Sequence, residues 1–303
     1  MATSSMKSAS TYAPQDISTK LNFLSKESAA MKERPFVNTN DHSERNFTLE
    51  EHEVFLRDAR PIAHELSLAN EGFILARHKL PRVDFRDPND VIRRYLPEMQ
   101  EFIQHISGAD KVVVCDGPIT RFANMAEKHS TQPALYTHTD YGGNSALASI
   151  GISRDRFLPQ EAADAERDEL LRKSFGTEQP EYKRVMSIQT WRTFSEPPHD
   201  TELAMCSSSS VEPEDVIIGE TKARFLDFDQ SSHEFSLYRH NPNQRWFYFP
   251  DMEPDEIMVL VGWDFTRPQL CRAQHSAFPN LRNGHLSTGR NSIDVRSFAF
   301  FRE

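Results

Sequence analysis

The second half of the chain is a succession of short segments that suit β-strands. They are rich in Val, Ile, Thr and aromatic residues, and Pro, Asn, Asp and Gly turns separate them. The segments are "RVMSIQTWRTF", "TELAMCSSSSV", "EFSLYRH", "RWFYFPDM", "EIMVLVGWDF", "LCRAQHSAF" and "SIDVRSFAFF". Short strands at this spacing predict a β-sandwich or a jelly roll.

Helical patterns are confined to the earlier part of the chain. The segment "FTLEEHEVFLRDARPI", with Thr48 as cap and Glu51 three residues later, predicts a capping box and a short helix. "DPNDVIRRYLPEMQEFIQHISG" predicts an amphipathic helix ending at Gly108, and "RFLPQEAADAERDELLRKSFG" a charged surface helix. "GFILARHKL" and "KVVVCDGPITR" predict strands. The whole pattern predicts an α+β, mainly β fold in which helices buttress the sheets.

The domain organisation follows from length and composition. Residues 1–34 are rich in Ser, Thr, Lys and Ala and predict a mobile N-terminal tail. Residues 35–303 are within the size of one large β domain. Hydrophobic residues make up 38% of the chain and include 21 Phe, which is enough to build a sizeable core.

Charge and cysteine content restrict the partners. The net charge of −10 argues against nucleic acid and anionic membranes, since both are bound through concentrated basic surfaces. The chain has no apolar run of about 18 residues and no signal-peptide core near its start. Its three cysteines are scattered and odd in number, which fits a reducing compartment. We therefore expect a cytoplasmic protein with a small-molecule substrate, whose oligomeric state the sequence does not indicate.

The stretch "YTHTDYGG" contains the first candidate site. Residues i and i+2 of a strand point to the same face, so His138 and Asp140 can converge on one metal ion. Gly142–Gly143 allow a sharp turn directly afterwards. The triplet alone is weak, because about two His-x-Asp/Glu triplets are expected by chance and a second occurs at His42–Glu44.

A non-haem iron site of the facial-triad type needs one more histidine. The candidates downstream are His199, His233, His240, His275 and His285. His199 and His240 follow or precede prolines, which predicts solvated turns.

The other three differ in their surroundings. His275 lies in the largely apolar "LCRAQHSAF", an inner strand, and is the favoured ligand. His233 opens a strand and is a competitor. His285 lies in a Gly-flanked loop. As a ligand, with Arg296 in the following strand as its cationic partner, it is an alternative to His275.

A candidate anion receptor follows His275. Arg290 and Ser292 are two residues apart and share a strand face. A guanidinium beside a hydroxyl suits a carboxylate, such as the far end of a dicarboxylate bound at the metal.

The order H-x-D, H, R-x-S resembles that of the Fe(II)/2-oxoglutarate-dependent oxygenases. In particular, residues 70–303 resemble the mainly fungal hydroxylase/desaturase group that includes AsaB-like proteins, gibberellin desaturase and a cephamycin methoxylation protein. The segments that carry the resemblance are "THTD", "IQTWRTF", "ELAMCSSSSV", "RWFYFPDMEPDEIMVLVGWDF", "AQHSAF" and "RNSIDVR". The resemblance implies that residues 35–303 form one double-stranded β-helix (jelly roll) domain.

The resemblance also implies roles for individual residues. His138, Asp140 and His275 would bind Fe(II), and Arg290 with Ser292 would bind 2-oxoglutarate. Arg192, in "TWRTF", is a second candidate for a carboxylate of cosubstrate or substrate. The candidates for the substrate side are Tyr136, Trp246, Tyr248 and Arg296.

The implied activity is O2-dependent oxidation of an unactivated C–H bond in fungal secondary metabolism, by hydroxylation, desaturation or oxidative cyclisation. Two alternatives stay open. A cupin-like isomerase or dioxygenase would not need 2-oxoglutarate. A non-catalytic β-sandwich binding protein would have no affinity for Fe(II).

Overall fold

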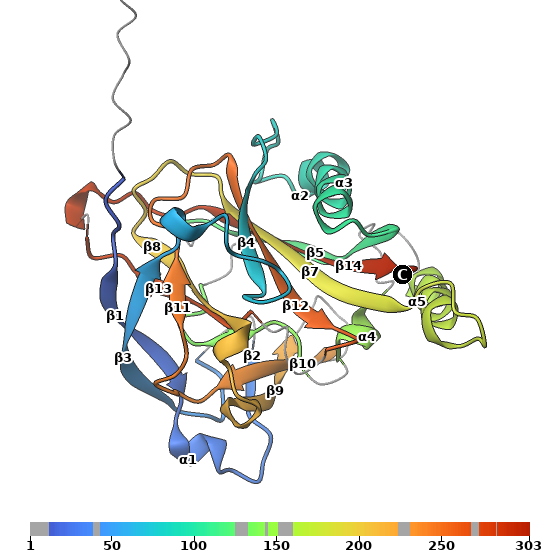
Figure 1. The fold of residues 1–303 in the computed structure, drawn as a ribbon, viewed down its shortest axis with the longest axis horizontal. Coiled ribbons are helices and arrows are strands. Elements are labelled where there is room, and N and C mark those ends of the chain that lie inside the picture. The colour runs from blue at the N-terminus through green and yellow to red at the C-terminus, as the bar shows by residue number, and fades with distance from the viewer. Residues whose placement is uncertain are drawn as a thin grey trace, which may run out of the picture.

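Two β-sheets dominate the computed structural model of the chain (Figure 1). It describes residues 12–38, 43–124, 133–142, 145–150, 160–223, 231–267, 273–282 and 284–303. The larger sheet has nine strands in the order β1 (Ile17–Leu24), β3 (Leu49–Asp58), β11 (Trp246–Tyr248), β8 (Thr201–Cys206), β13 (His275–Pro279), β6 (His138–Thr139), β10 (Ser231–Tyr238), β9 (Val216–Ala223) and β2 (Phe36–Asn38). The smaller sheet has five strands in the order β4 (Phe73–Arg77), β12 (Glu256–Asp264), β7 (Arg184–Thr193), β14 (Ser292–Phe301) and β5 (Lys111–Arg121).

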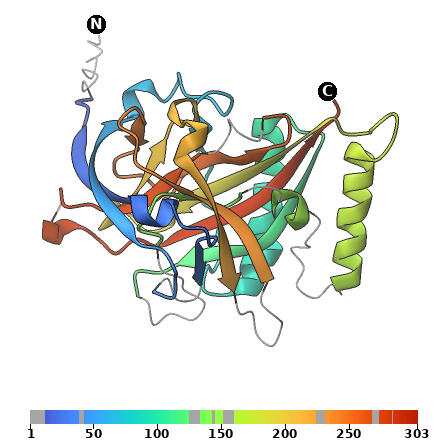
Figure 2. The same ribbon diagram turned by 90° about the horizontal axis from the view of Figure 1, so that it is seen from below.

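Helices lie at the outside of these sheets. They are α1 (Lys26–Ala29), α2 (Pro88–Asp90), α3 (Leu96–Ser107), α4 (Ser145–Ser149) and α5 (Gln160–Phe175), and a π-helical turn (Val91–Tyr95) joins α2 to α3. Helix α3 packs against β5 and β14 (Figure 1). Helix α5 stands at the end of the molecule where the chain terminates (Figure 2). No helix in the described ranges is both long and apolar enough to cross a membrane.

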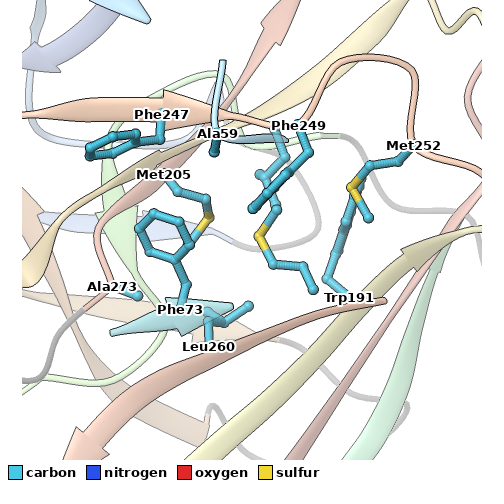
Figure 3. Packing of buried hydrophobic residues seen from close by; sticks show 11 residues of the cluster. Ala59, Phe73, Trp191, Met205, Phe247, Phe249, Met252, Leu260 and Ala273 are labelled. Carbon is cyan, nitrogen blue, oxygen red and sulfur yellow. The ribbon is translucent and has the colours of Figure 1, made fainter. Parts of the chain in front are cut away.

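An apolar core fills part of the space between the two sheets. Figure 3 shows Phe247 and Met205 of the larger sheet facing Phe73 and Leu260 of the smaller one. Burying side chains of this size is the main favourable contribution to folding, at roughly 1.5–3 kcal/mol each. This core holds the sheets together beside the polar region described below.

The first half of strand β14, residues 292–296, is apolar on one face and polar on the other. Ile293 and Val295 pack into the cluster under α3. The alternate residues Ser292 and Asp294 are also buried, at 0% and 7% exposure, but belong to the opposite face. The inner face of the smaller sheet therefore carries polar side chains into the interior of the molecule.

Most of the expected elements are confirmed. The seven strand segments of the second half correspond to β7, β8, β10, β11, β12, β13 and β14, and the two earlier strand segments to β4 and β5. The amphipathic helix ends as predicted, at Gly108 with φ = +70°, and the charged helix is α5. The expected mainly β fold with buttressing helices is confirmed.

The helix predicted after Thr48 is wrong, because residues 49–58 form strand β3. The Thr48 hydroxyl bonds to the hydroxyls of Ser25 and Ser28 and does not cap a helix. Val54 and Leu56 are buried while Phe55 between them is exposed, which is a period of two residues. Strand pairing with β1 has overridden a local capping signal.

The expected mobile tail over residues 1–34 also needs correction, because Ile17–Leu24 is strand β1. It pairs with β3 along its whole length, from Ile17 opposite Leu56 to Leu24 opposite Leu49. Leu21 and Phe23 are fully buried, whereas the polar residues of the same strand are exposed or half-buried. The structured part of the chain therefore begins before residue 35, and one domain over the remainder stays a prediction.

Replacing Phe23 tests whether β1 belongs to the folded unit. Phe23→Ala should lower the free energy of unfolding by about 3–5 kcal/mol, because it removes a fully buried ring from a packed cluster. Ser18→Ala, an exposed position on the same strand, should change it by less than about 0.5 kcal/mol. Denaturant unfolding measures the free energy of unfolding of both variants. Equal stability of Phe23→Ala and wild type would show that residues 17–24 are not part of the folded unit.

Candidate metal centre

Three ligand-type side chains converge between the sheets. His138 lies on β6, Asp140 follows it directly, and His275 begins β13, the neighbour of β6, where it is paired with His138. One ligand atom from each of the three lies within 4.8 Å of the others. Pairing of adjacent strands thus brings together residues that are 137 positions apart in the chain, the separation of His138 from His275.

The two imidazoles are oriented for metal binding. Nδ1 of His138 donates to the carbonyl of Tyr136 and Nδ1 of His275 to the carbonyl of Ala273, each at 2.9 Å. Because a carbonyl only accepts, both rings carry their proton on Nδ1 and present a lone pair on Nε2. Each Nε2 lies 3.9 Å from one oxygen of Asp140. Histidines that bind metals in proteins are held in this way.

The carboxylate of Asp140 is held by the smaller sheet. Arg296 of β14 donates to Oδ1 and Gln189 of β7 to Oδ2, each at 2.8 Å. His233 of β10 donates to the backbone carbonyl of Asp140 at 2.8 Å. Since a carboxylate has about four lone-pair positions, these bonds leave others for a metal.

The electrostatics favour the ligand forms of these residues. Burial, with a contribution from His275, lowers the pKa of His138 to about 3, so the ring is neutral at pH 7. Burial opposes ionisation of Asp140, but Arg296 and the two histidines hold the pKa of its carboxyl well below the ordinary range. A metal ion would displace no proton from either residue at neutral pH.

Gly142 permits a close backbone approach beside the triad. A Cβ at this position would lie 2.6 Å from the carbonyl oxygen of Phe235, and the Gly142 N–H donates to the carbonyl of Glu234 at 2.9 Å. The glycine therefore lets the chain after Asp140 pack directly on β10. The expected role of Gly143 lies outside the described residues.

A cavity adjoins the triad between the two sheets. The residues that line it from the smaller sheet and its flanks are Arg121, Gln189, Trp191, Leu260, Arg290 and Asp294. Those that line it from the larger sheet and its flanks are Pro133, Ala134, His138, Asp140, Leu203, His275 and Ala277.

Several buried polar groups of this region lack partners among the described residues. They include Nε of Arg290, Oγ of Ser292 and Oε1 of Gln189. Nη1 of Arg290 lies at the hydrogen-bond limit of 3.5 Å from two carbonyls of β8, and its guanidinium is 5.3 Å from the Trp191 ring centre. Burial, and the charge of Arg121, lower the pKa of Arg290 to about 9. A carboxylate placed here would satisfy the orphan groups and stabilise the charge.

Arg192 lies outside this group. It follows Trp191 on β7, so its side chain is on the opposite face of the sheet. There it bonds Nδ1 of His78 at 2.9 Å and lies 5.7 Å from the Tyr95 ring centre. The structure therefore does not bring Arg192 to the triad.

Of the four residues expected on the substrate side, some lie near the triad and others lie away from it. Trp246 and Tyr248 pack in the cluster beneath β1, on the face of β11 opposite Phe247. Tyr136 is buried in a third cluster, with its ring centre 5.1 Å from that of His138. Arg296 lies at the site, where it bonds Asp140.

Among the competing histidines, the expectation for His199 is wrong. It is buried at 1% exposure, and its Nε2 donates to the carbonyl of Ser195 at 3.0 Å. His240 is half-buried and stacks on His52, while His285 is exposed in a short 3-10 turn. His233 bonds the backbone of Asp140 and is not one of the three converging ligands.

Sequence reasoning missed Gln189, Asp294 and Arg121. Gln189 is two residues before Trp191, and Asp294 two residues after Ser292, so strand alternation would have placed them on the inner faces. Arg121 ends a strand whose inner and outer faces the sequence does not distinguish. The ligand and cosubstrate roles themselves stay predictions, taken up below.

The chain matches one protein family over almost its whole length. The family model described as "Oxidoreductase/YMDC permease-like domain" matches residues 21–300. A relative named Fe(II)/2-oxoglutarate-dependent dioxygenase nvfI, from Aspergillus novofumigatus, is 26% identical over 262 residues, covering 84% of this chain and 85% of the relative. The hydroxylase/desaturase asaB of Aspergillus flavus is 25% identical over 174 residues, covering 53% and 76%. These names confirm the resemblance expected from the sequence.

Solved structures share the fold. The structure described as iron and alpha-ketoglutarate-dependent endoperoxidase NvfI superposes with a TM-score of 0.76 at 21% identity, covering 95% of this chain and 99% of the other. At this identity the likeness shows the fold, and it confirms the expected jelly roll.

Metal binding tests the triad directly. We expect Mn²⁺, a redox-inert probe, to stabilise the wild-type protein by about 2.7 kcal/mol at a concentration 100 times its Kd. His138→Ala and His275→Ala should lose this stabilisation, whereas His285→Ala, in the exposed turn, should keep it. Thermal unfolding with and without the ion measures the effect, and an undiminished shift in either triad variant would contradict the site.

Removing a donor to Asp140 should weaken the metal site without removing a ligand. Gln189→Leu deletes the bond to Oδ2 and should reduce Mn²⁺ affinity about 10- to 100-fold, the usual effect of losing a partner of a metal ligand. Thr190→Val, the next residue on the opposite face of β7, is the matched control and should bind normally. Titration calorimetry measures both, and equal affinities would show that Gln189 does not position Asp140.

Proposed function

The chain belongs to the family described as "Oxidoreductase/YMDC permease-like domain", and we propose that it is an Fe(II)- and 2-oxoglutarate-dependent oxygenase that oxidises a C–H bond of a small metabolite. His138, Asp140 and His275 hold the iron. Arg290 and Ser292 receive the distal carboxylate of 2-oxoglutarate.

The observation that carries the proposal is that a set of metal-ligand atoms and an anion receptor lie beside one cavity. Two imidazole Nε2 atoms and a carboxylate converge on its lining. Beside them, the buried Nε of Arg290 and Oγ of Ser292 have no partner among the described residues. A dicarboxylate that chelates a metal through its keto acid end satisfies both sets at once.

When bound, iron and 2-oxoglutarate supply O2 activation coupled to conversion of the cosubstrate to succinate and CO2. The remaining tasks belong to the protein. The Nδ1–carbonyl bonds fix both imidazoles, while Arg296 and Gln189 fix the carboxylate. In a hydroxylation, one oxygen atom of O2 would end in succinate and the other in the substrate. Desaturation and oxidative cyclisation are the other outcomes within the same proposal.

The two alternatives account for less of the site. A cupin-like enzyme independent of 2-oxoglutarate leaves the orphan groups of Arg290 and Ser292 without a purpose. A non-catalytic binding protein would not need two histidines with the same tautomer facing one ionised carboxylate. Each alternative predicts a different result in the assay below.

The setting that we propose is fungal secondary metabolism in the cytoplasm. Relatives with names of this kind come from Aspergillus flavus and Talaromyces stipitatus, the latter a 23% identical alpha-ketoglutarate-dependent dioxygenase. The buried, unpaired Cys206 is compatible with a reducing compartment.

Succinate release tests the activity without knowledge of the substrate. With Fe(II), 2-oxoglutarate, ascorbate and O2, the wild-type protein should convert 2-oxoglutarate slowly to succinate. His138→Ala and Asp140→Ala should abolish this turnover. Metal-dependent turnover without 2-oxoglutarate would support the cupin-like enzyme. A protein that does not bind Fe(II) would support the non-catalytic binding protein.

Affinity for 2-oxoglutarate tests the carboxylate receptor. Arg290→Met should weaken it at least about tenfold, because a charge-assisted hydrogen bond contributes roughly 1.5–3 kcal/mol. Arg192→Lys, on the opposite face of β7, should bind 2-oxoglutarate like the wild type. If Arg192→Lys weakened 2-oxoglutarate binding and Arg290→Met did not, Arg192 would be the carboxylate receptor.

A further inference from the structure

Arg121 is a cationic side chain of the cavity that iron and 2-oxoglutarate binding do not use. It is the last residue of β5, the edge strand of the smaller sheet, and it is paired with Ser292 on β14. It lines the cavity together with Arg290, Asp294 and His138. A long cation therefore lies beside the proposed cosubstrate receptor, at the sheet edge.

The guanidinium of Arg121 makes no hydrogen bond or ion pair to any residue in the described ranges, although the side chain is half-buried. Burial lowers the pKa of its guanidinium, and the nearby charges of Asp294 and Asp140 oppose this effect only in part. By contrast, Arg296 bonds Asp140 at 2.8 Å and lies 3.6 Å from Asp294. A partly buried guanidinium without a hydrogen-bonded counter-ion is costly unless an anion binds it.

The guanidiniums of Arg290 and Arg121 belong to different parts of the cavity. Arg290 lies next to the carbonyls of Thr201 and Glu202 on β8. The carboxylates that act most on Arg121 are Asp294 and Asp140, on the side of the metal triad. An anion on Arg121 would therefore lie near the reacting centre and beside the cosubstrate.

We propose that Arg121 binds a carboxylate of the primary substrate, and that the substrate class is a small metabolite with one free carboxylate near the carbon that is oxidised. This inference rests on the proposed oxygenase function. It makes Arg121 a specificity-determining residue, since a guanidinium that binds a carboxylate through two parallel hydrogen bonds rejects the corresponding ester or amide.

Benzoate and benzamide test the proposal, because they have nearly the same shape and differ by one charge. The protein is loaded anaerobically with Fe(II) and 2-oxoglutarate, and each probe is titrated by calorimetry. Wild type should bind benzoate at least about tenfold more tightly than benzamide. Arg121→Met should lower benzoate affinity roughly 10- to 100-fold and leave affinity for 2-oxoglutarate unchanged.

Two further variants control for charge and folding. Arg57→Met removes an exposed arginine of β3 and should leave benzoate binding unchanged, which separates a local contact from the loss of net charge. Arg121→Lys keeps the charge but not the fork and should bind benzoate with intermediate affinity. Retention of 2-oxoglutarate binding shows that a variant is folded at the site.

Three results would overturn the proposal: equal benzoate affinity in wild type and Arg121→Met, no preference for benzoate over benzamide in wild type, or a parallel loss of 2-oxoglutarate affinity in Arg121→Met. The last would place Arg121 in the cosubstrate receptor. Failure of the oxygenase proposal has a different signature, because the wild type would then not bind 2-oxoglutarate in the presence of Fe(II).

Discussion

The ion pair between Arg296 and Asp140 is the interaction on which the organisation of the site depends. Asp140 follows a short strand of the larger sheet, and Arg296 projects from β14, an inner strand of the smaller one, so their 2.8 Å bond joins the two sheets at the triad. Gln189 adds a second bond between the sheets on the other carboxylate oxygen. The ligand geometry is therefore a property of how the sheets face each other, and not of either sheet alone.

This arrangement puts charge into the interior of the protein, next to the apolar core between the sheets. On β14, Ile293 and Val295 pack beneath α3, while the alternate positions carry Asp294 and Arg296 toward the cavity. Buried charges are costly unless they are paired. Helix α3 makes the arrangement possible by covering the outer face, which lets the inner face be polar without leaving the strand unsupported.

Local periodicity was sufficient wherever a role depended on one strand. A two-residue spacing placed His138 with Asp140, and an apolar surrounding favoured His275 over the exposed His285. It failed where the face of a strand mattered, since Arg192 adjoins Trp191 in sequence but points to the opposite side. It also failed for β1 and β3, whose polar composition concealed a buried alternation that only mutual pairing stabilises.

The sequence by itself therefore determined the chemistry available: which side chains alternate along a strand, where the strands of the second half and the two main helices lie, and that two histidines, a carboxylate and an Arg-x-Ser occur in the right order. The tertiary structure decided which of these faces meet. Register between β6 and β13 brings His275 to His138, and the facing of two sheets brings Gln189 and Arg121 to the same cavity and Arg296 to Asp140. The physical reason is that strand pairing and sheet packing act between residues far apart in the chain, where no local pattern records the partner.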